Sequence, residues 1–397
     1  MKKLAKMILA TVMAIAMSAG AMAQEATAIT PIPLIARPEI RLMRSLDETA
    51  FAFAYWNASV FHITPMPGRS AEINRAVAAI RAENPLNLPT IVVNPEPVPG
   101  TTYSFAERSA ARQVLGADLE QMRIQGVGFN RDGLGVFMAS IATDADREAV
   151  LELSPISAIT FLEAQSVNSP TPLPPAGFVA GGRYTPLPSG SSPPVITGAN
   201  WVRRSNYENW STFTVSAVRN WNGVTGEAGV LTVGHGFQDG QPVFAGNNGG
   251  RIGVANVQLG NNIDVTFVRL DYPSQFPSGY LRGGNRVSRL TSMTAFDYGR
   301  AVTNHAPAGT TVGQIVLTQY IFQMTTGGRL NRFENGFVTT NSARLGNSGS
   351  PVMTGRTTLA GYVISAAGTR TTSENWSYSV ILPISEVIAA TGFHPAF

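Results

Sequence analysis

The second half of this chain consists of short β-type runs separated by turns, and this pattern restricts the possible folds more than any other feature. After about residue 195, helical periodicity almost disappears, and runs such as residues 229–233 and 265–270 follow one another with Gly, Asn and Ser clustered between them. Many short strands with frequent turns predict an antiparallel β-barrel or β-sandwich. The one helix predicted here is Ile384–Thr391, because Gly392 is placed to end it.

The length of the chain and its first residues predict an exported protein with two folded units. At 397 residues the chain is too long for one domain of ordinary size. Three lysines precede an apolar run over residues 7–17, and residues 21–23 have the small-x-small form of a cleavage site. This pattern predicts a signal peptide over residues 1–23 and a secreted or periplasmic protein without a membrane anchor. A Pro/Gly/Ser-rich linker over residues 169–194 separates the two units.

Composition excludes several classes of site and partner. The chain has no cysteine, so disulfides, cysteine nucleophiles and thiolate metal sites are excluded, and no cofactor or metal is expected. Residues 24–189 carry 12 Arg and 16 acidic residues, a net charge of −4, whereas residues 190–397 carry 14 Arg and 9 acidic residues, a net charge of +5. The two halves therefore attract each other weakly. Apart from Arg203-Arg204 the arginines of the basic half are scattered singly, so nucleic-acid binding is not expected.

The region between the signal peptide and the linker, residues 24–168, mixes helical and strand patterns. The predicted elements are, in order, a helix over residues 104–121, strands over 125–129 and 134–138, a helix opened near Thr143, and a strand over 159–162. This order predicts a small α+β unit ahead of the β-rich half.

The Gly-Asn-Ser-Gly-Ser-Pro sequence at residues 346–351 has the form of a loop that presents a nucleophilic serine, Ser348. A serine is a poor nucleophile at neutral pH unless a neighbouring base takes its proton. The glycines on both sides permit a tight backbone that aims the N–H groups of Gly346 and Ser348 at the oxygen of a tetrahedral intermediate. This loop therefore predicts a nucleophile with its oxyanion hole.

His235 and Asp264 are the partners that such a serine requires. Of the four histidines, His235 alone follows a predicted strand and is flanked by glycines, while His305 is predicted to lie in a loop. Asp264 precedes alternating apolar residues, so a carboxylate there can hold the imidazole in one tautomer. Taken singly, His235 has an incidental role in most contexts, Asp264 is as well explained as a turn residue, and the serine loop could be a plain turn.

The three segments together, in the order His, Asp, Ser, resemble the chymotrypsin-like serine proteases over residues 195–397. The separations of 29 and 84 residues suit the short bacterial members of the streptogrisin and α-lytic type, and the serine loop is similar to that of glutamyl endopeptidases. The resemblance implies two six-stranded β-barrels with the site in the cleft between them. It further implies that Ser348 is the nucleophile, His235 the general base and then acid, and Asp264 the orienting carboxylate.

The same resemblance identifies candidate residues for the substrate side-chain pocket. The candidate substrate-binding residues are Ser342, Ala343, Ser365, Ala366, Ala367 and Trp376. Ser342 stands where trypsin-like enzymes carry an aspartate, so a preference for basic side chains is not expected. Three alanines and a tryptophan favour small or medium apolar side chains. Asn347 replaces the aspartate that pairs with a new N-terminus in trypsin-type zymogens, so activation by that ion pair is not expected.

We therefore predict a secreted serine endopeptidase made as a precursor, with protein or peptide substrates. The middle of the N-terminal region resembles part of the pro-regions of α-lytic-type proteases, although an unrelated α+β domain fits the pattern equally well. Its predicted role is that of a pro-region, over residues 24–168, which assists folding, inhibits the enzyme and is removed by a cut in or near the linker. Two alternatives are a catalytically silent protein of the same fold that serves as a binding or structural module, and an unrelated carbohydrate-binding or adhesive β-domain.

Overall fold

The structure is a computed structural model. It describes residues 31–139, 141–162, 198–199, 201–203, 211–212, 214–219, 227–245, 250–272, 281, 285–307, 309–344, 346–370 and 375–396. The predicted signal peptide and linker lie outside the described residues. Among the helices that are described, none combines the length and the apolar character needed to cross a membrane.

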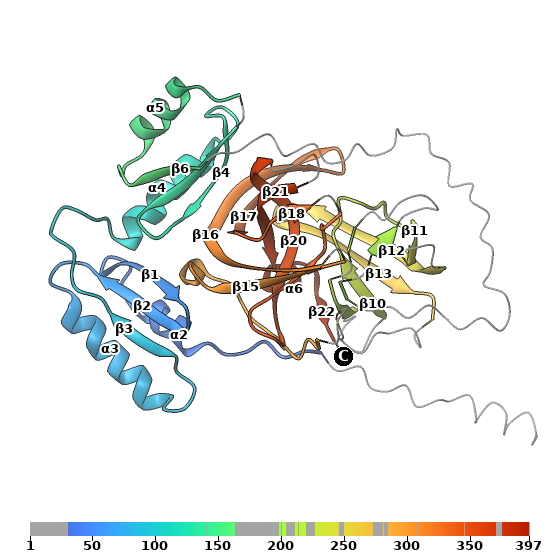
Figure 1. Cartoon of the computed structure of the whole chain (residues 1–397), viewed down its shortest axis with the longest axis horizontal. Helices are drawn as coiled ribbons and strands as arrows, with labels where there is room; N and C mark the ends of the chain where they lie inside the picture. Colours follow the sequence, from blue (N-terminus) through green and yellow to red (C-terminus); the bar gives the residue numbers. More distant parts are fainter. Residues whose placement is uncertain are drawn as a thin grey trace, which may run out of the picture. The chain divides into compact units, whose positions relative to one another are not determined.

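The first part of the chain forms a small sheet that the sequence analysis left unassigned. Its elements are α2 (Pro38–Ser45), β1 (Phe51–Asn57), β2 (Val60–Pro65), α3 (Ser70–Glu83) and β3 (Thr90–Val93), labelled in Figure 1. β1 and β2 are antiparallel neighbours, whereas β2 and β3 run parallel, with α3 as the crossover between them. Most of β1 is buried, because its consecutive aromatic and alanine residues face the core on both sides.

The second part of the N-terminal region confirms the predicted order of helices and strands. Its elements are α4 (Phe105–Ala117), β4 (Ile124–Phe129), β5 (Leu134–Met138), α5 (Asp144–Leu153) and β6 (Ile159–Leu162). α4 begins at a capping box of Ser104 and Glu107, and α5 begins at one made by Thr143 and Asp146. α4 ends four residues before the predicted boundary.

Six strands of the C-terminal half close into a barrel, because the first strand in their order also pairs with the last. These strands are β15 (Ala301–Ala306), β16 (Gly309–Thr326), β17 (Arg329–Thr339), β19 (Pro351–Met353), β20 (Thr358–Arg370) and β21 (Asn375–Pro383). Their order is β15-β19-β20-β21-β17-β16, and β15 pairs with β16. His305 lies within β15 and not in a loop, so this prediction was wrong.

β4 continues this sheet beyond the barrel. It pairs antiparallel with β16, so that Val127 lies opposite Ile321, and β5 and β6 follow outward. Where β4 pairs with β16, the hydrophobic cores of the N-terminal region and of the C-terminal half each include residues from the other part of the chain. Phe137 of β5 is buried in the core of the C-terminal half, while Ile321 and Phe296 are buried in the N-terminal core. Within the described unit from Pro31 onward, the two halves are therefore packed as one body.

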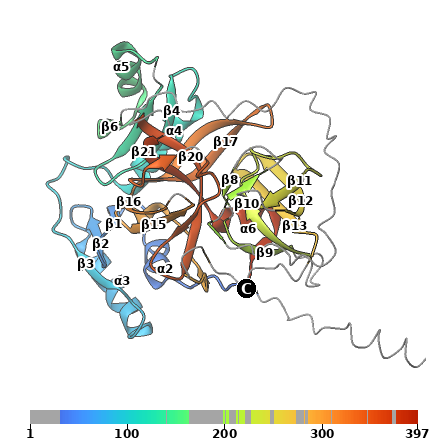
Figure 2. The ribbon, with the colours of Figure 1, turned by 45° about the vertical axis from the view of Figure 1, so that its right-hand side comes forward.

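Eight other strands of the C-terminal half form a separate sheet, and several of them are labelled in Figure 2. In spatial order they are β22 (Phe393–Pro395), β9 (Ser216–Arg219), β10 (Ala228–Thr232), β13 (Ile263–Leu270), β12 (Arg251–Gly260), β11 (Pro242–Ala245), β7 (Trp201–Arg203) and β8 (Ser211–Thr212). β13 is buried on both faces: Val265 and Phe267 belong to the large core, and Val268 and Leu270 belong to a smaller one.

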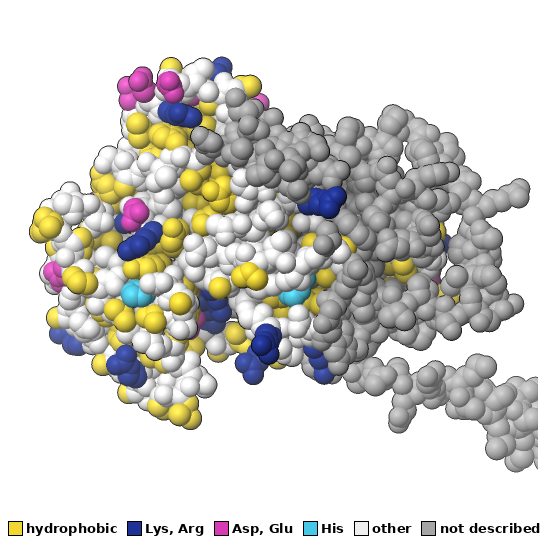
Figure 3. Space-filling view, in the orientation of Figure 1, with side chains coloured by type: hydrophobic (Ala, Val, Ile, Leu, Met, Phe, Trp, Pro, Cys, Tyr) yellow, Lys and Arg dark blue, Asp and Glu magenta, His cyan; other side chains and the backbone are white. Residues whose placement is uncertain are grey.

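The C-terminal helix α6 (Ile384–Thr391) matches its predicted bounds. Gly392 ends it in the left-handed conformation, with φ 69°, which favours glycine. β12 was not predicted, because its alternation is interrupted by glycine and polar residues. On the face seen in Figure 3 the basic side chains are scattered and form no continuous patch.

Candidate active site

His235 follows the central strand β10 at a point where only glycine fits beside it. A Cβ on Gly234 would lie 2.6 Å from Leu259 Cδ2 and 2.9 Å from Asp264 Oδ1. Gly234 thus lets its own N–H approach the carboxylate, to which it donates at 2.9 Å. The glycine before His235 is therefore required by close approach to Asp264, in addition to the turn that the sequence suggested.

Asp264 on β13 is fully buried, and both oxygens of its carboxylate accept hydrogen bonds from the turn that carries His235. Oδ1 accepts the main-chain N–H groups of Gly234 and His235, the latter at 2.7 Å, and Oδ2 lies 2.6 Å from Nδ1 of His235. Because the carboxylate accepts from Nδ1, that nitrogen carries a proton and Nε2 remains free to act as a base. The arrangement fixes both the ring orientation and its tautomer.

Ser348 lies in a loop that is bonded to both sheets. The main-chain oxygen of Ser348 accepts from Thr212 N–H at 2.8 Å, and the N–H of Gly349 donates to Val363 O at 2.7 Å. Gly349 has φ 87°, and a Cβ there would lie 2.0 Å from Thr212 O, so no larger residue fits. The loop holds Ser348 Oγ 3.2 Å from His235 Nε2. Ser348, His235 and Asp264, which are held by two different sheets, thus form one chain of hydrogen bonds, here called the relay.

Two N–H groups of this loop remain available. Within the part of the chain that the structure describes, the main-chain N–H groups of Gly346 and Ser348 have no hydrogen-bond partner. Gly346 has φ 85°, the left-handed conformation that favours glycine. Both groups can therefore donate a hydrogen bond to a bound ligand, and their role as an oxyanion hole stays a prediction.

The environment of His235 raises its pKa. Burial lowers the pKa of the imidazole, but the charge of Asp264 and its hydrogen bond to Nδ1 raise it, and these two effects together prevail. The protonated ring, which must form when Ser348 loses its proton, is therefore stabilised relative to a free histidine.

This shift predicts the pH dependence of the site. If the neutral imidazole of His235 acts as the base, activity should rise with pH through a midpoint above the ordinary histidine value of about 6.5. In the Asp264→Asn variant the charge is gone and burial remains, so the midpoint should move below that value. NMR titration of the histidine ring nitrogens in Ser348→Ala and Ser348→Ala/Asp264→Asn proteins measures both; equal midpoints would contradict this account.

Tyr362 connects the two sides of the relay, and the sequence analysis missed it. Its side chain is fully buried on β20, and its hydroxyl donates to the main-chain oxygen of Asp264 at 2.8 Å. The next residue, Val363, bonds to the serine loop in both directions, through Gly349 N–H and Ser350 O. Burial, with a contribution from the charge of Asp264, raises the pKa of Tyr362, so the hydroxyl stays a donor. No local signal exists for a contact across 98 residues.

We expect Tyr362→Phe to lower kcat about tenfold with little change in KM. The main-chain oxygen of Asp264 loses its buried hydrogen-bond donor, so the position of the Asp264 carboxylate is held less firmly. The matched control is Tyr320→Phe. Tyr320 is equally buried in the same barrel, and its hydroxyl has no hydrogen bond among the described residues. Steady-state kinetics of both variants test this; equal loss of activity in the two would assign the effect to general packing.

The candidate substrate-binding residues lie on neighbouring strands. Ala343 of β18 (Ala343–Arg344) is opposite Trp376 of β21, and Ala366 and Ala367 of β20 are opposite Ser379 and Tyr378 of β21. Ala343, Ala367 and Trp376 are buried. Ser342 is exposed, while Ser365 and Ala366 are half-buried. The structure therefore brings these segments together at one end of the C-terminal barrel.

Comparisons with known proteins give structural likenesses at low sequence identity. No family model and no curated protein sequence matches the chain. A glutamic acid-specific serine protease shares 16% identity, with a TM-score of 0.39, over 50% of this chain and 100% of its own. A Nocardiopsis protease shares 22% (TM-score 0.38) and Thermobifida fusca protease A 20% (TM-score 0.38), each over 51% of this chain and 98% of its own. The function proposed below is therefore argued from the side chains described above.

Proposed function

We propose that this chain is a serine endopeptidase made as a precursor, hydrolysing peptide bonds through an acyl-enzyme on Ser348. The observation that carries the proposal is the relay of a buried carboxylate, a tautomer-fixed histidine and a half-buried serine, with contacts of 2.6 Å and 3.2 Å. Three donors of the His235 turn, two main-chain N–H groups and Nδ1, converge on the fully buried carboxylate of Asp264. The relay lies beside two free N–H groups, which is the chemistry that acyl transfer needs.

In the proposed reaction Ser348 Oγ attacks the scissile carbonyl carbon while its proton passes to His235 Nε2. The carbonyl oxygen becomes an oxyanion that accepts from the N–H groups of Gly346 and Ser348. When the C–N bond breaks, His235 returns the proton to the leaving amine, and the acyl group stays on Ser348. A water that gives a proton to His235 then attacks the ester carbon; the bond to Ser348 Oγ breaks, His235 returns the proton to Oγ, and the carboxylic acid product leaves. Asp264 keeps its charge and stabilises the imidazolium throughout.

Labelling with a fluorophosphonate tests this proposal directly. The parent chain should be labelled on Ser348 and the Ser348→Ala variant should not. Ser350→Ala is the matched control, because Ser350 is two residues away and fully buried, and its hydroxyl has no partner among the described residues. Absence of labelling in parent protein whose N-terminal region has been removed by a second protease would favour the catalytically silent module or the adhesive domain.

For substrate preference we propose small or medium apolar side chains at the cleavage site. The support is the set of buried alanines, Ala343 and Ala367, opposite the mostly buried Trp376 and Tyr378 on β21. A bulky side chain at this end of the barrel leaves less room for a substrate side chain, and no acidic residue is among the candidates.

Trp376→Ala should enlarge the proposed pocket. We expect kcat/KM for substrates with Phe before the cleaved bond, relative to those with Ala, to rise by roughly 10–100-fold, the usual range for gaining or losing apolar contacts in a pocket. A matched pair of peptide substrates measures the ratio. An unchanged ratio would remove Trp376 from the pocket without touching the assignment of Ser348.

For the N-terminal region we propose the role of a pro-region that assists folding and inhibits the enzyme. Its strand β4 extends the sheet of the C-terminal barrel through β16. A cavity of only about 10 Å³ separates Gln125 of β4 from Ser365, Ala366 and Ala367, so β4 packs against the candidate substrate-binding segment. This contact supports inhibition by coverage, with cleavage in or near the linker as the processing step.

A further inference from the structure

A short segment at the beginning of the described chain is bonded to the C-terminal half far from β4. This segment, residues 31–37, is here called the N-terminal strap. The N–H of Ile32 donates to Pro395 O at 2.8 Å, and Leu290 exchanges two bonds with the strap, from its N–H to Pro33 O and from Ile35 N–H to its oxygen, both at 2.9 Å. The strap therefore lies between β22 and β14 (Arg289–Leu290) as an added extended peptide.

Ile32 anchors the strap by burial. Its side chain is fully buried and belongs to the core of the C-terminal half, together with Leu290 and Phe393. Burial of an isoleucine side chain stabilises the folded state by removing apolar surface from water. Because Ile32 lies over 160 residues before the protease half in sequence, this part of the core depends on a contact across the linker.

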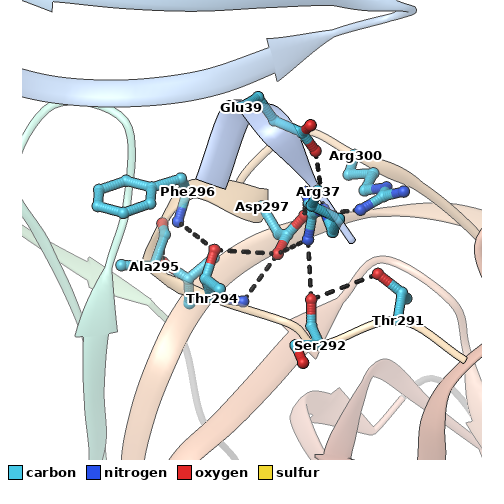
Figure 4. Close-up of polar contacts among 10 residues, drawn as sticks. Arg37, Glu39, Thr291, Ser292, Thr294, Ala295, Phe296, Asp297 and Arg300 are labelled. Atoms are coloured by element: carbon cyan, nitrogen blue, oxygen red, sulfur yellow. Dashed lines mark hydrogen bonds and ion pairs between the residues drawn. The ribbon is translucent and has the colours of Figure 1, made fainter. Parts of the chain in front are cut away.

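Arg37 anchors the other end of the strap by charge. Figure 4 shows its guanidinium between Glu39 and Asp297. Its nitrogens donate to both carboxylate oxygens of Asp297, at 2.9 and 2.7 Å, to Glu39 Oε1 at 2.7 Å and to Ser292 O at 2.8 Å. Arg300 donates to the same Asp297 at 3.0 Å. Two arginines and two carboxylates thus form an electrically neutral cluster.

This cluster is buried, so the loss of one member cannot be repaired by solvent. Asp297 is fully buried, and only 6% of the Arg37 side chain is exposed. Burial raises the pKa of Asp297, but the charges of Arg37 and Arg300 lower it to about 2 overall, so the carboxylate stays charged. Removing one partner from a buried pair is strongly destabilising, because the other charge stays behind without compensation.

We propose that the N-terminal strap is a permanent docking segment for the groove formed by β22, β14 and the 291–300 loop, so that cutting the linker yields a two-chain protein and not a free C-terminal half. The groove recognises an extended peptide with an isoleucine that enters the core and, five residues later, an arginine that reaches Asp297. The interlocked cores at Phe137 and Phe296 hold the rest of the N-terminal region on the same body. Release of the N-terminal region therefore requires a second cut or disruption of the Arg37 cluster.

The test uses the full chain carrying Ser348→Ala, which cannot digest itself, with a site for a specific protease placed in the linker. After complete cutting, the two fragments should elute together in gel filtration at both 0.15 M and 1 M NaCl, because a buried ion pair is little screened by salt. Separation of the cut parent protein into free fragments would overturn the proposal. Since this protein is inactive by design, the result does not depend on the proposed peptidase activity.

Two variants distinguish the strap from the rest of the interface. Arg37→Ala should raise the dissociation rate of the N-terminal fragment by roughly 100-fold, the change expected when one partner of a buried pair is removed. The matched control is Arg41→Ala, four residues away, whose ion pair with Glu83 is exposed and should change the rate less than about twofold. Equal rates for the two variants would overturn the role of Arg37.

Hydrogen exchange on the cut parent protein gives a readout that needs no substitution, in case Arg37→Ala fails to fold. The amides of Ile32 and Ile35 should exchange as slowly as those of the adjoining barrel strands. Fast exchange at both amides while the barrel stays protected would show that the strap is not docked, and would overturn the proposal.

Discussion

Alanine at Ser348 or at His235 is expected to lower kcat by roughly 10⁵–10⁶-fold, and alanine at Asp264 by about 10⁴-fold, while the fold is preserved. In the proposed mechanism Ser348 supplies the bond-forming oxygen, and its proton passes to His235 Nε2, which lies 3.2 Å away. Asp264 fixes the ring through its 2.6 Å contact. Because the three groups act in one step, the triple variant should be about as slow as the worst single variant. Single-turnover and steady-state peptide hydrolysis measure these losses.

The controls for this prediction lie close to the site. Ser350→Ala removes a buried hydroxyl that has no partner among the described residues, so activity should stay near that of the parent. Asp271→Asn breaks an ion pair with Arg251 on the same sheet and should also be nearly silent. Near-normal activity of Ser348→Ala, or a large loss with Ser350→Ala, would contradict the assignment.

The second large effect concerns the C-terminal half expressed alone. Residues 190–397 without the N-terminal region should give very little folded, active protein. Its core would lose Ile32 and Phe137, and Asp297 would lose Arg37. Each of these losses is of the order of 2–5 kcal/mol, whereas a domain of this kind is stable by about 5–15 kcal/mol in total. A barrel rich in contacts between distant residues also folds slowly without a template.

Adding residues 24–189 in trans should restore the yield and then inhibit the enzyme when present in excess. The opposite net charges, −4 and +5, contribute a term that salt weakens, since exposed charges are screened beyond about 8–10 Å. A fragment carrying Arg37→Ala is the matched comparison and should restore much less. Unchanged yield of active protein without any N-terminal fragment would contradict the proposed folding role.

Much of the architecture was predictable because its signals are local. Short β-type runs with Gly and Asn turns indicated the antiparallel C-terminal half, and the bounds of α6 follow from Pro383 and Gly392. Capping and turn residues likewise marked α5 and the β4–β5 hairpin. The first sheet was missed. Its strand β1 depends on consecutive aromatic and alanine residues that have no alternating pattern, although β2 does alternate.

The candidate site divides in the same way. The residue types and the order of His235, Asp264 and Ser348 are sequence properties. His235 and Ser348 lie beside glycines that are needed for tight backbone approach, and Asp264 precedes alternating apolar residues. The contacts of 2.6 and 3.2 Å between these side chains arise only when the two sheets pack together in the folded chain. The bond from Tyr362 to Asp264 spans 98 residues, so it too is visible only in the tertiary structure.

The division of the chain into an N-terminal region, a linker and a β-rich half was predicted from composition, which is a sum over neighbouring residues. The contacts between the N-terminal region and the C-terminal half were decided by the tertiary structure. In the sequence, nothing distinguishes Arg37 from other arginines or Ile32 from other isoleucines. Their charge pairing and burial are set by residues that lie more than 200 positions away. Only folding brings Asp297 and Leu290 to them, and the free energy of the desolvated contacts then makes the strap part of the C-terminal core.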